Sequence, residues 1–185
     1  MMTKLYDDKD YETAYRLKRK LLAVYLAALT AVFAACAVVF VLFLLMPYAS
    51  TPELKARKDL YMFIDCALSV LFAIYSVIYI CIPYRRARFY FKMLDDMRVG
   101  EKTKNVATFL RNDETITEVR FVDFRTMVVL EWSEKTQEYM RRNVLVDKEK
   151  PMPDFKSGDI ITYETHANML VSYGLKSDDD VFGDL

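Results

Sequence analysis

The sequence has few of the residues that build metal centres, disulfides and catalytic loops. It contains one histidine, three cysteines and four glycines among 185 residues. His166 has no cysteine near it, which argues against a zinc site. Cys36, Cys66 and Cys81 stand within apolar stretches, so no disulfide framework is predicted. No phosphate-binding loop, dinucleotide fingerprint or Gly-x-Ser-x-Gly elbow occurs, and we expect neither a cofactor nor enzymatic activity.

The chain also has no net charge. Lys and Arg number 26, as do Asp and Glu. Nucleic-acid binding needs a basic surface, so we expect no nucleic-acid partner. The mean hydropathy of +0.05 combines a very apolar first half with a charged second half.

Two long runs without proline in their interiors predict membrane-spanning helices. Leu21–Met46 has no charged residue, and Leu60–Ile82 has only Asp65. Both exceed the length of about 20 apolar residues that a span needs. Pro83 is expected to end the second helix. The predicted organisation is a cytoplasmic N-terminal segment (1–20), a first helix (21–46), an extracytoplasmic loop (47–59), a second helix (60–82), a basic amphipathic juxtamembrane helix (83–100), a small β-barrel domain (101–175) and an acidic tail (176–185).

Basic residues flank the two spans unevenly. They are frequent before the first span and after the second, whereas the connecting loop holds only Lys55, Arg57 and Lys58. The positive-inside rule therefore predicts that both termini are cytoplasmic. We expect a multi-pass protein of a bacterial inner membrane.

Small residues form a stripe on each predicted helix. Alanines recur every fourth residue on the first helix, and the second carries a comparable small and polar face. Such stripes allow close approach of another helix, either within one hairpin or from another subunit. The predicted helix–helix interface comprises Ala23, Ala27, Ala31, Ala35, Asp65, Ser69, Ala73 and Ser76.

Asp65 is the one ionisable carboxylate within either span. A carboxylate inside the membrane is costly and is a functional hypothesis by default. Asp65 could instead lie at the outer interface, with 66–82 as the true span. If it is buried, its partner is expected on another protomer or another protein.

The segment after the second span is basic and helical in pattern. Phe89, Met93 and Met97 share one helical face, and Gly100 is expected to end the helix. Anionic lipid headgroups attract juxtamembrane cations, although a plain positive-inside anchor would look the same. The predicted headgroup contacts are Arg85, Arg86, Arg88 and Lys92.

From Lys102 onward the pattern changes to short β-rich runs. Strands are expected at 105–111, 116–124, 126–132, 138–146, 159–165 and 169–174, with 134–142 as an alternative short helix. The fold class is therefore an α+β membrane protein, a two-helix transmembrane hairpin followed by a small antiparallel β-barrel of OB-like or SH3-like type. We expect the barrel to fold without the helices. The aromatic side chains are expected in its core or at its rim: Phe121, Phe124, Trp132, Tyr139, Tyr163 and Tyr173.

One stretch of the barrel carries a resemblance to a known group. Phe155-Lys-Ser-Gly158-Asp159-Ile-Ile-Thr-Tyr163, followed by Met169-Leu-Val-Ser-Tyr173, resembles the last strands of membrane-tethered bacterial OB-type domains such as the NfeD-like proteins. The low glycine content of this barrel departs from that group. The resemblance implies interaction or scaffolding and transfers no catalytic residue.

These features favour a non-enzymatic, membrane-anchored adaptor that presents a cytoplasmic β-domain to a partner protein or to copies of itself. The alternative is a subunit of an oligomeric transport or channel assembly that uses Asp65. A membrane enzyme ranks last. Expected partners are membrane lipids and either a homo-oligomer or a membrane protein, and the acidic tail could dock through Val181 and Phe182.

Overall fold

The computed structural model describes residues 2–47 and 51–176, which form two compact units. One unit is helical and spans residues 16–87. The other joins residues 2–15 to residues 88–176. Residues 177–185 of the acidic tail, with Val181 and Phe182, lie outside the described residues.

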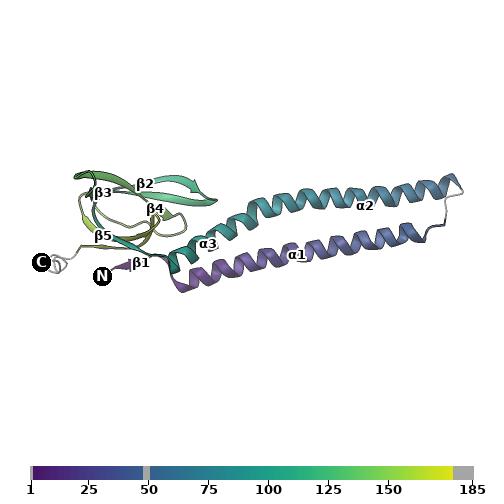
Figure 1. Cartoon of the computed structure of the whole chain (residues 1–185), viewed down its shortest axis with the longest axis horizontal. Helices are drawn as coiled ribbons and strands as arrows, with labels where there is room; N and C mark the ends of the chain where they lie inside the picture. The colour runs from purple at the N-terminus through teal and green to yellow at the C-terminus, as the bar shows by residue number, and fades with distance from the viewer. Residues whose placement is uncertain (1, 48–50, 177–185) are drawn as a thin grey trace. The chain divides into compact units, whose positions relative to one another are not determined.

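Two long helices form the helical unit and lie side by side (Figure 1). Helix α1 spans Asp8–Leu45 and α2 spans Pro52–Tyr79. Each is long and apolar enough to cross a membrane. Thr51 caps α2, where its side chain accepts a hydrogen bond from the Leu54 N–H, and Pro52 occupies the first turn, where its missing N–H costs nothing.

Pro83 does not end the second helix, contrary to the sequence prediction. A π-helical turn, η1 (Ile80–Tyr84), contains the proline and leads directly into α3 (Arg85–Val99). A π-turn changes the local hydrogen-bond spacing, so the helix continues past a residue that lacks an N–H. Helix α3 ends immediately before Gly100, as predicted.

The two long helices pack through aromatic side chains. The Tyr25 ring stacks against Phe72 and Tyr79, with centroid distances of 6.2 and 5.9 Å. The Tyr79 hydroxyl donates a 3.0 Å hydrogen bond to the Leu21 carbonyl oxygen. Half-buried residues continue this packed face of α1 at intervals of three or four, at positions 28, 32, 36, 39 and 43.

The second unit contains a closed five-stranded barrel. Its strands are β2 (Thr103–Val119), β3 (Val122–Ser133), β4 (Glu138–Asp147), β5 (Ile160–His166) and β6 (Met169–Leu175). Hydrogen-bonded neighbours follow the order β2-β3-β4-β6-β5, and β5 pairs with β2 to close the barrel. Residues 138–142 are therefore strand, not helix.

The barrel is not wholly antiparallel, which corrects the predicted fold class in one detail. Strand β4 runs parallel to β6, and their pairing is limited to Leu145 with Met169. A short strand at the N-terminus, β1 (Thr3–Lys4), pairs with β6 at Tyr173 and Ser172. The chain's first residues thus extend the sheet along β6 (Figure 1).

The first predicted strand boundary is also wrong. Residues 112–114 do not turn the chain, because β2 continues to Val119 with a register shift between Asp113 and Thr117. The Asp113 carboxylate accepts a 3.0 Å hydrogen bond from the Thr115 N–H, which accounts for a turn-like sequence inside a strand. The true turn lies at Arg120 and Phe121, which have φ values of 51° and 67°.

Two apolar clusters stabilise the barrel unit. Inside the barrel, alternate strand residues pack with Leu5 from the N-terminal segment: Ala107, Phe109, Met127, Val129, Val144, Val146, Ile161, Tyr163 and Leu170. Outside it, α3 and the first turns of α1 cover one face through Ala14, Met93, Leu94, Met97, Val122, Phe124 and Val171. The strands therefore do not supply the whole core, and both helical segments belong to it.

Candidate functional site

On the outer side of β2, β3 and β4, side chains of neighbouring strands lie opposite one another in rows. The register pairs Trp132 with Tyr139, Leu130 with Arg141, and Val128 with Asn143. Arg111 of β2 pairs with Val128, which brings a second guanidinium onto the same face. We call this surface the aromatic–basic face, made of Arg111, Val128, Leu130, Trp132, Tyr139 and Arg141.

An exposed aromatic pair lies at one end of the aromatic–basic face. The Trp132 and Tyr139 rings meet edge to face at 5.1 Å, and the two residues are 50% and 65% exposed. Of the aromatic residues expected in the core or at the rim, Phe124 and Tyr163 are buried in the core, whereas Trp132 and Tyr139 are exposed on the outer side. Exposed Trp, Tyr and Arg are the residue types that dominate the binding energy of protein interfaces.

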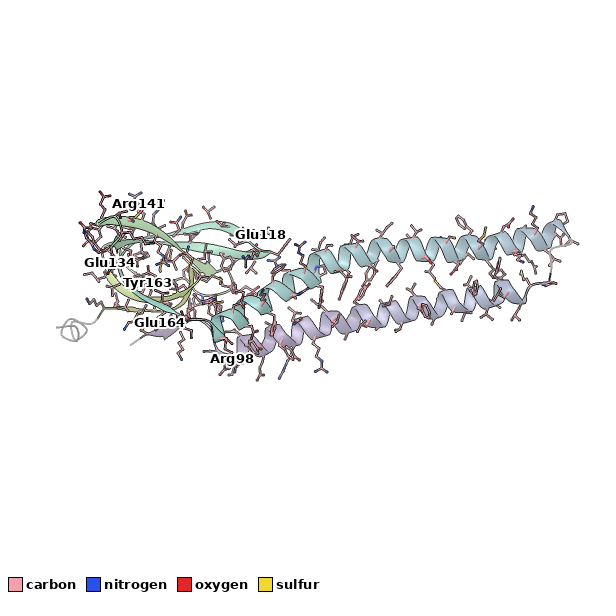
Figure 2. All side chains as sticks on the ribbon, viewed as in Figure 1. Arg98, Glu118, Glu134, Arg141, Tyr163 and Glu164 are labelled. Carbon is pink, nitrogen blue, oxygen red and sulfur yellow. The ribbon has the colours of Figure 1, made fainter. Side chains whose placement is uncertain are left out.

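A groove continues the face beside this pair. It has a volume of about 490 Å³ and is lined by Arg111, Asp113, Thr126, Val128, Arg141 and Asn143, among others. The Arg141 side chain lies on the outside of the barrel, whereas Tyr163 lies within it (Figure 2). Arginine and threonine groups at this groove provide hydrogen-bond donors next to an apolar patch, which suits a protein segment.

A polar network fixes the strand that carries Arg141. One Glu131 carboxylate oxygen accepts a 3.0 Å bond from the Arg142 guanidinium and a 3.2 Å bond from the Tyr163 hydroxyl. Burial, and then the Glu131 charge, raise the pKa of Tyr163 to about 12. Tyr163 is therefore a protonated donor at neutral pH. Tyr163 donates a hydrogen bond to Glu131, and Glu131 forms an ion pair with Arg142 of β4. These polar groups therefore have a structural role, because they orient β4.

A second network attaches α3 and the turn after β4 to the barrel. The buried Asp147 carboxylate accepts a 2.9 Å bond from the Tyr90 hydroxyl and a 3.0 Å bond from the Glu149 N–H. Burial, and then the Asp147 charge, raise the pKa of Tyr90. The Arg125 guanidinium holds the same turn through the carbonyl oxygens of Lys148 and Lys150.

His166 lies at the end of β5, directly before the turn at Ala167 and Asn168. Its Nδ1 is 3.0 Å from the Glu101 carbonyl oxygen. This contact ties β5 to the segment that follows α3.

The predicted helix-face residues fall on two sides of the hairpin. The four stripe alanines at 23, 27, 31 and 35 are exposed on α1, as are Ser69 and Ala73 on α2. Asp65 and Ser76 are half-buried, and the Ser76 hydroxyl bonds the Phe72 carbonyl oxygen at 2.8 Å. The alanine stripe is therefore not the face that packs with α2 inside this chain.

Asp65 has an unusual environment for a carboxylate in an apolar helix. Its Oδ1 atom is buried and has no hydrogen-bond partner among the described residues. The side chain borders a cavity of about 230 Å³ that is otherwise lined by Val39, Phe40, Phe43, Tyr61, Met62 and Cys66. One turn further along α2, the Ser69 hydroxyl lies 3.9 Å from the Cys36 sulfur.

The four predicted headgroup residues are all exposed. Arg85 and Arg86 belong to the helical unit, and Arg88 and Lys92 to the barrel unit. Sequence reasoning missed the aromatic–basic face, because a Trp or Tyr in an alternating strand pattern is equally compatible with the core. Only the register shows that Trp132 and Tyr139 share the outer side with Arg141.

Comparison with known proteins gives no match, whether against protein-family models, curated proteins or solved structures. Functional inference therefore depends on the residues of this chain alone.

Proposed function

We propose that this protein is a membrane-anchored adaptor whose barrel binds a partner protein through the aromatic–basic face. The observation that carries the proposal is the exposed Trp132–Tyr139 pair beside Arg141 and the groove. Exposed large aromatic side chains are unfavourable in water and often mark an interaction site. Here they share one face with two arginines, and aromatic residues with arginine are typical of the hot spots of protein interfaces. The partner is another protein or a second copy of the chain.

The barrel topology supports the OB-like type over the SH3-like type. The order β2-β3-β4-β6-β5-β2 closes the barrel and places its third and fifth strands side by side in parallel. In OB-type barrels the face of the second and third strands, here β3 and β4, is a ligand-binding surface. The aromatic–basic face lies mainly on those strands.

A matched pair of double variants tests the proposal in the full chain. We expect Trp132→Ala with Tyr139→Ala to abolish the complex seen on native gels after extraction in mild detergent. Ile116→Ala with Leu175→Ala is the control, because these residues are also exposed and apolar but lie at the register shift of β2 and at the end of β6. A wild-type protein that is strictly monomeric and has no co-purifying partner would contradict the proposal.

Both termini are proposed to be cytoplasmic, in a bacterial inner membrane. The support is the low number of basic residues in the loop, Lys55, Arg57 and Lys58, compared with the two outer flanks. A phosphatase reporter that is active only outside the cytoplasm should be silent when fused after Leu185. Activity of that fusion would reverse the orientation.

Asp65 favours a second candidate, a subunit of an oligomeric transport assembly. Its unpartnered carboxylate oxygen faces a cavity between apolar side chains, so a proton, an ion or a neighbouring subunit would satisfy it. Two helices form no pore alone, so this function requires assembly. Asp65→Asn should then change ion or proton flux in reconstituted vesicles, and an unchanged flux rejects the idea.

A further inference from the structure

A second groove lies on the barrel unit, between α3 and the β2–β3 hairpin. Its volume is about 250 Å³. Phe89, Val119 and Met169 contribute apolar walls, and Lys92, Arg120 and Asp96 contribute the charged groups. The groove thus combines an apolar interior with two cations and one carboxylate.

The two cations have no partner of their own among the described residues. Neither the Lys92 ammonium nor the Arg120 guanidinium makes a hydrogen bond or an ion pair within residues 2–47 and 51–176. Both side chains are exposed, and so is Asp96 on the same wall. The charged lining therefore has a positive excess, which is complementary to an anionic group.

The hairpin turn that carries Arg120 is strained. Arg120 and Phe121 both have positive φ, 51° and 67°, in a two-residue connection that favours Asn and Gly. The Phe121 ring stacks on Phe89 of α3 with a centroid distance of 5.7 Å, which anchors this turn against the helix. The contact holds Arg120 at the groove.

We propose that this groove binds one anionic phospholipid, with its phosphate between Lys92 and Arg120 and an acyl chain against Phe89, Val119 and Met169. A free inorganic anion would not need the apolar wall, and an uncharged lipid would not need the two cations. The combination of both therefore specifies an anionic amphiphile. The inference rests on the proposed membrane anchoring, since Lys92 follows closely in sequence after the apolar run that ends at Ile82. It adds Arg120, a residue of the barrel, to the lipid contacts.

Native mass spectrometry of the full-length protein tests this site. The protein is released from nanodiscs that contain equal amounts of phosphatidylglycerol and phosphatidylcholine. We expect the wild type to retain one phosphatidylglycerol in preference to phosphatidylcholine, and Lys92→Gln with Arg120→Gln to reduce the retained fraction about tenfold. Lys104→Gln with Lys156→Gln removes the same charge from exposed positions of the barrel unit outside this groove and should leave retention unchanged.

The apolar wall has its own variant. Val119→Asn keeps every charge and should also reduce retention, whereas Val106→Asn, elsewhere on β2, should not. Millimolar inorganic phosphate should fail to displace the bound lipid. The fluorescence of Trp132, the single tryptophan, reports whether each variant unfolds cooperatively.

Three results would overturn the proposal: no preference for phosphatidylglycerol, equal loss in the control pair, or displacement by phosphate. Extraction of membranes with carbonate separates this failure from that of the proposed function. If the wild type is washed out, the membrane anchoring itself is wrong. If the wild type stays in the membrane and retains lipid without selectivity, only the groove proposal fails.

Discussion

The Lys150 ammonium lies 2.6 Å from a carboxylate oxygen of Asp10, which precedes it by 140 positions in the chain. This ion pair joins the turn after β4 to the first turn of α1. The ammonium also lies 5.4 Å from the centre of the Tyr6 ring. Nearby, the Arg98 guanidinium of α3 lies 4.9 Å from the ring centre of Tyr11. The N-terminal segment is therefore a structural part of the barrel unit.

The Asp10–Lys150 pair predicts a pH-dependent stability. Partial burial alone would raise the pKa of Asp10, but hydrogen bonds from the Asp7 N–H and from Lys150, with the charge of Lys150, lower it below its usual 3.8. A carboxyl with a lowered folded-state pKa stabilises the fold above its unfolded-state pKa, and this contribution is lost as the pH falls through the folded-state value.

Asp10→Asn should accordingly destabilise the barrel by about 1 kcal/mol at neutral pH, the size expected for a partly exposed pair. The difference from wild type should shrink below about pH 4, near the usual carboxyl pKa. Urea unfolding followed by Trp132 fluorescence measures it. If the stability difference between wild type and Asp10→Asn is the same at pH 3 and at pH 7, the charge of Asp10 is not involved.

The N-terminal segment should be required for the barrel to fold. The sequence alone predicts that a fragment from Glu101 folds independently, but that fragment lacks Leu5, Met93, Leu94 and Met97, which are buried in the two clusters. We expect residues 101–176 to be molten or insoluble. Residues 2–15 joined by a flexible linker to 88–176 should unfold cooperatively in urea. Cooperative unfolding of the shorter fragment would contradict this.

Sequence patterns predicted the two helices and most strands because their signals are local. A charge-free run of apolar residues and an alternating strand pattern each reveal one element. The pairing of β1 with β6 and the packing of Leu5 are not local, since no pattern in Thr3–Leu5 specifies a partner far along the chain. The turn predicted at Asn112-Asp113-Glu114 was wrong. These residues are typical of turns, but here they form an irregularity within β2. A turn at Arg120 and Phe121 has no Gly or Asn to reveal it.

Gly100 should tolerate no side chain. A Cβ atom there would overlap the His166 ring and would lie 2.5 Å from the Asp96 carbonyl oxygen. We expect Gly100→Ala to cost about 1–3 kcal/mol in urea unfolding, as overpacking typically does. Adding His166→Ala should recover part of the loss, because the backbone contact remains. A neutral Gly100→Ala would mean that this junction after α3 is more open than the structure shows.

The alanine stripe should matter for assembly and not for the hairpin itself. Ala27 and Ala31 are exposed on α1, so leucines at both positions leave the Tyr25–Tyr79 packing intact. If another chain packs on the stripe, the bulkier residues should weaken association by about 1–3 kcal/mol. Light scattering in detergent measures the mass of the complex. Val38→Leu with Val41→Leu is the control at exposed positions outside the stripe, and equal masses for both pairs would assign the stripe to lipid.

Site-specific photo-crosslinking in cells tests the central claim, that the aromatic–basic face is the binding surface. Benzoylphenylalanine replaces Tyr139 or Arg141 in the full chain, and replaces Ile160 as an exposed control on β5. The adaptor function predicts one adduct of the same size from positions 139 and 141 and none from position 160. Absence of an adduct at 139 and 141, or the same adduct at 160, would contradict it.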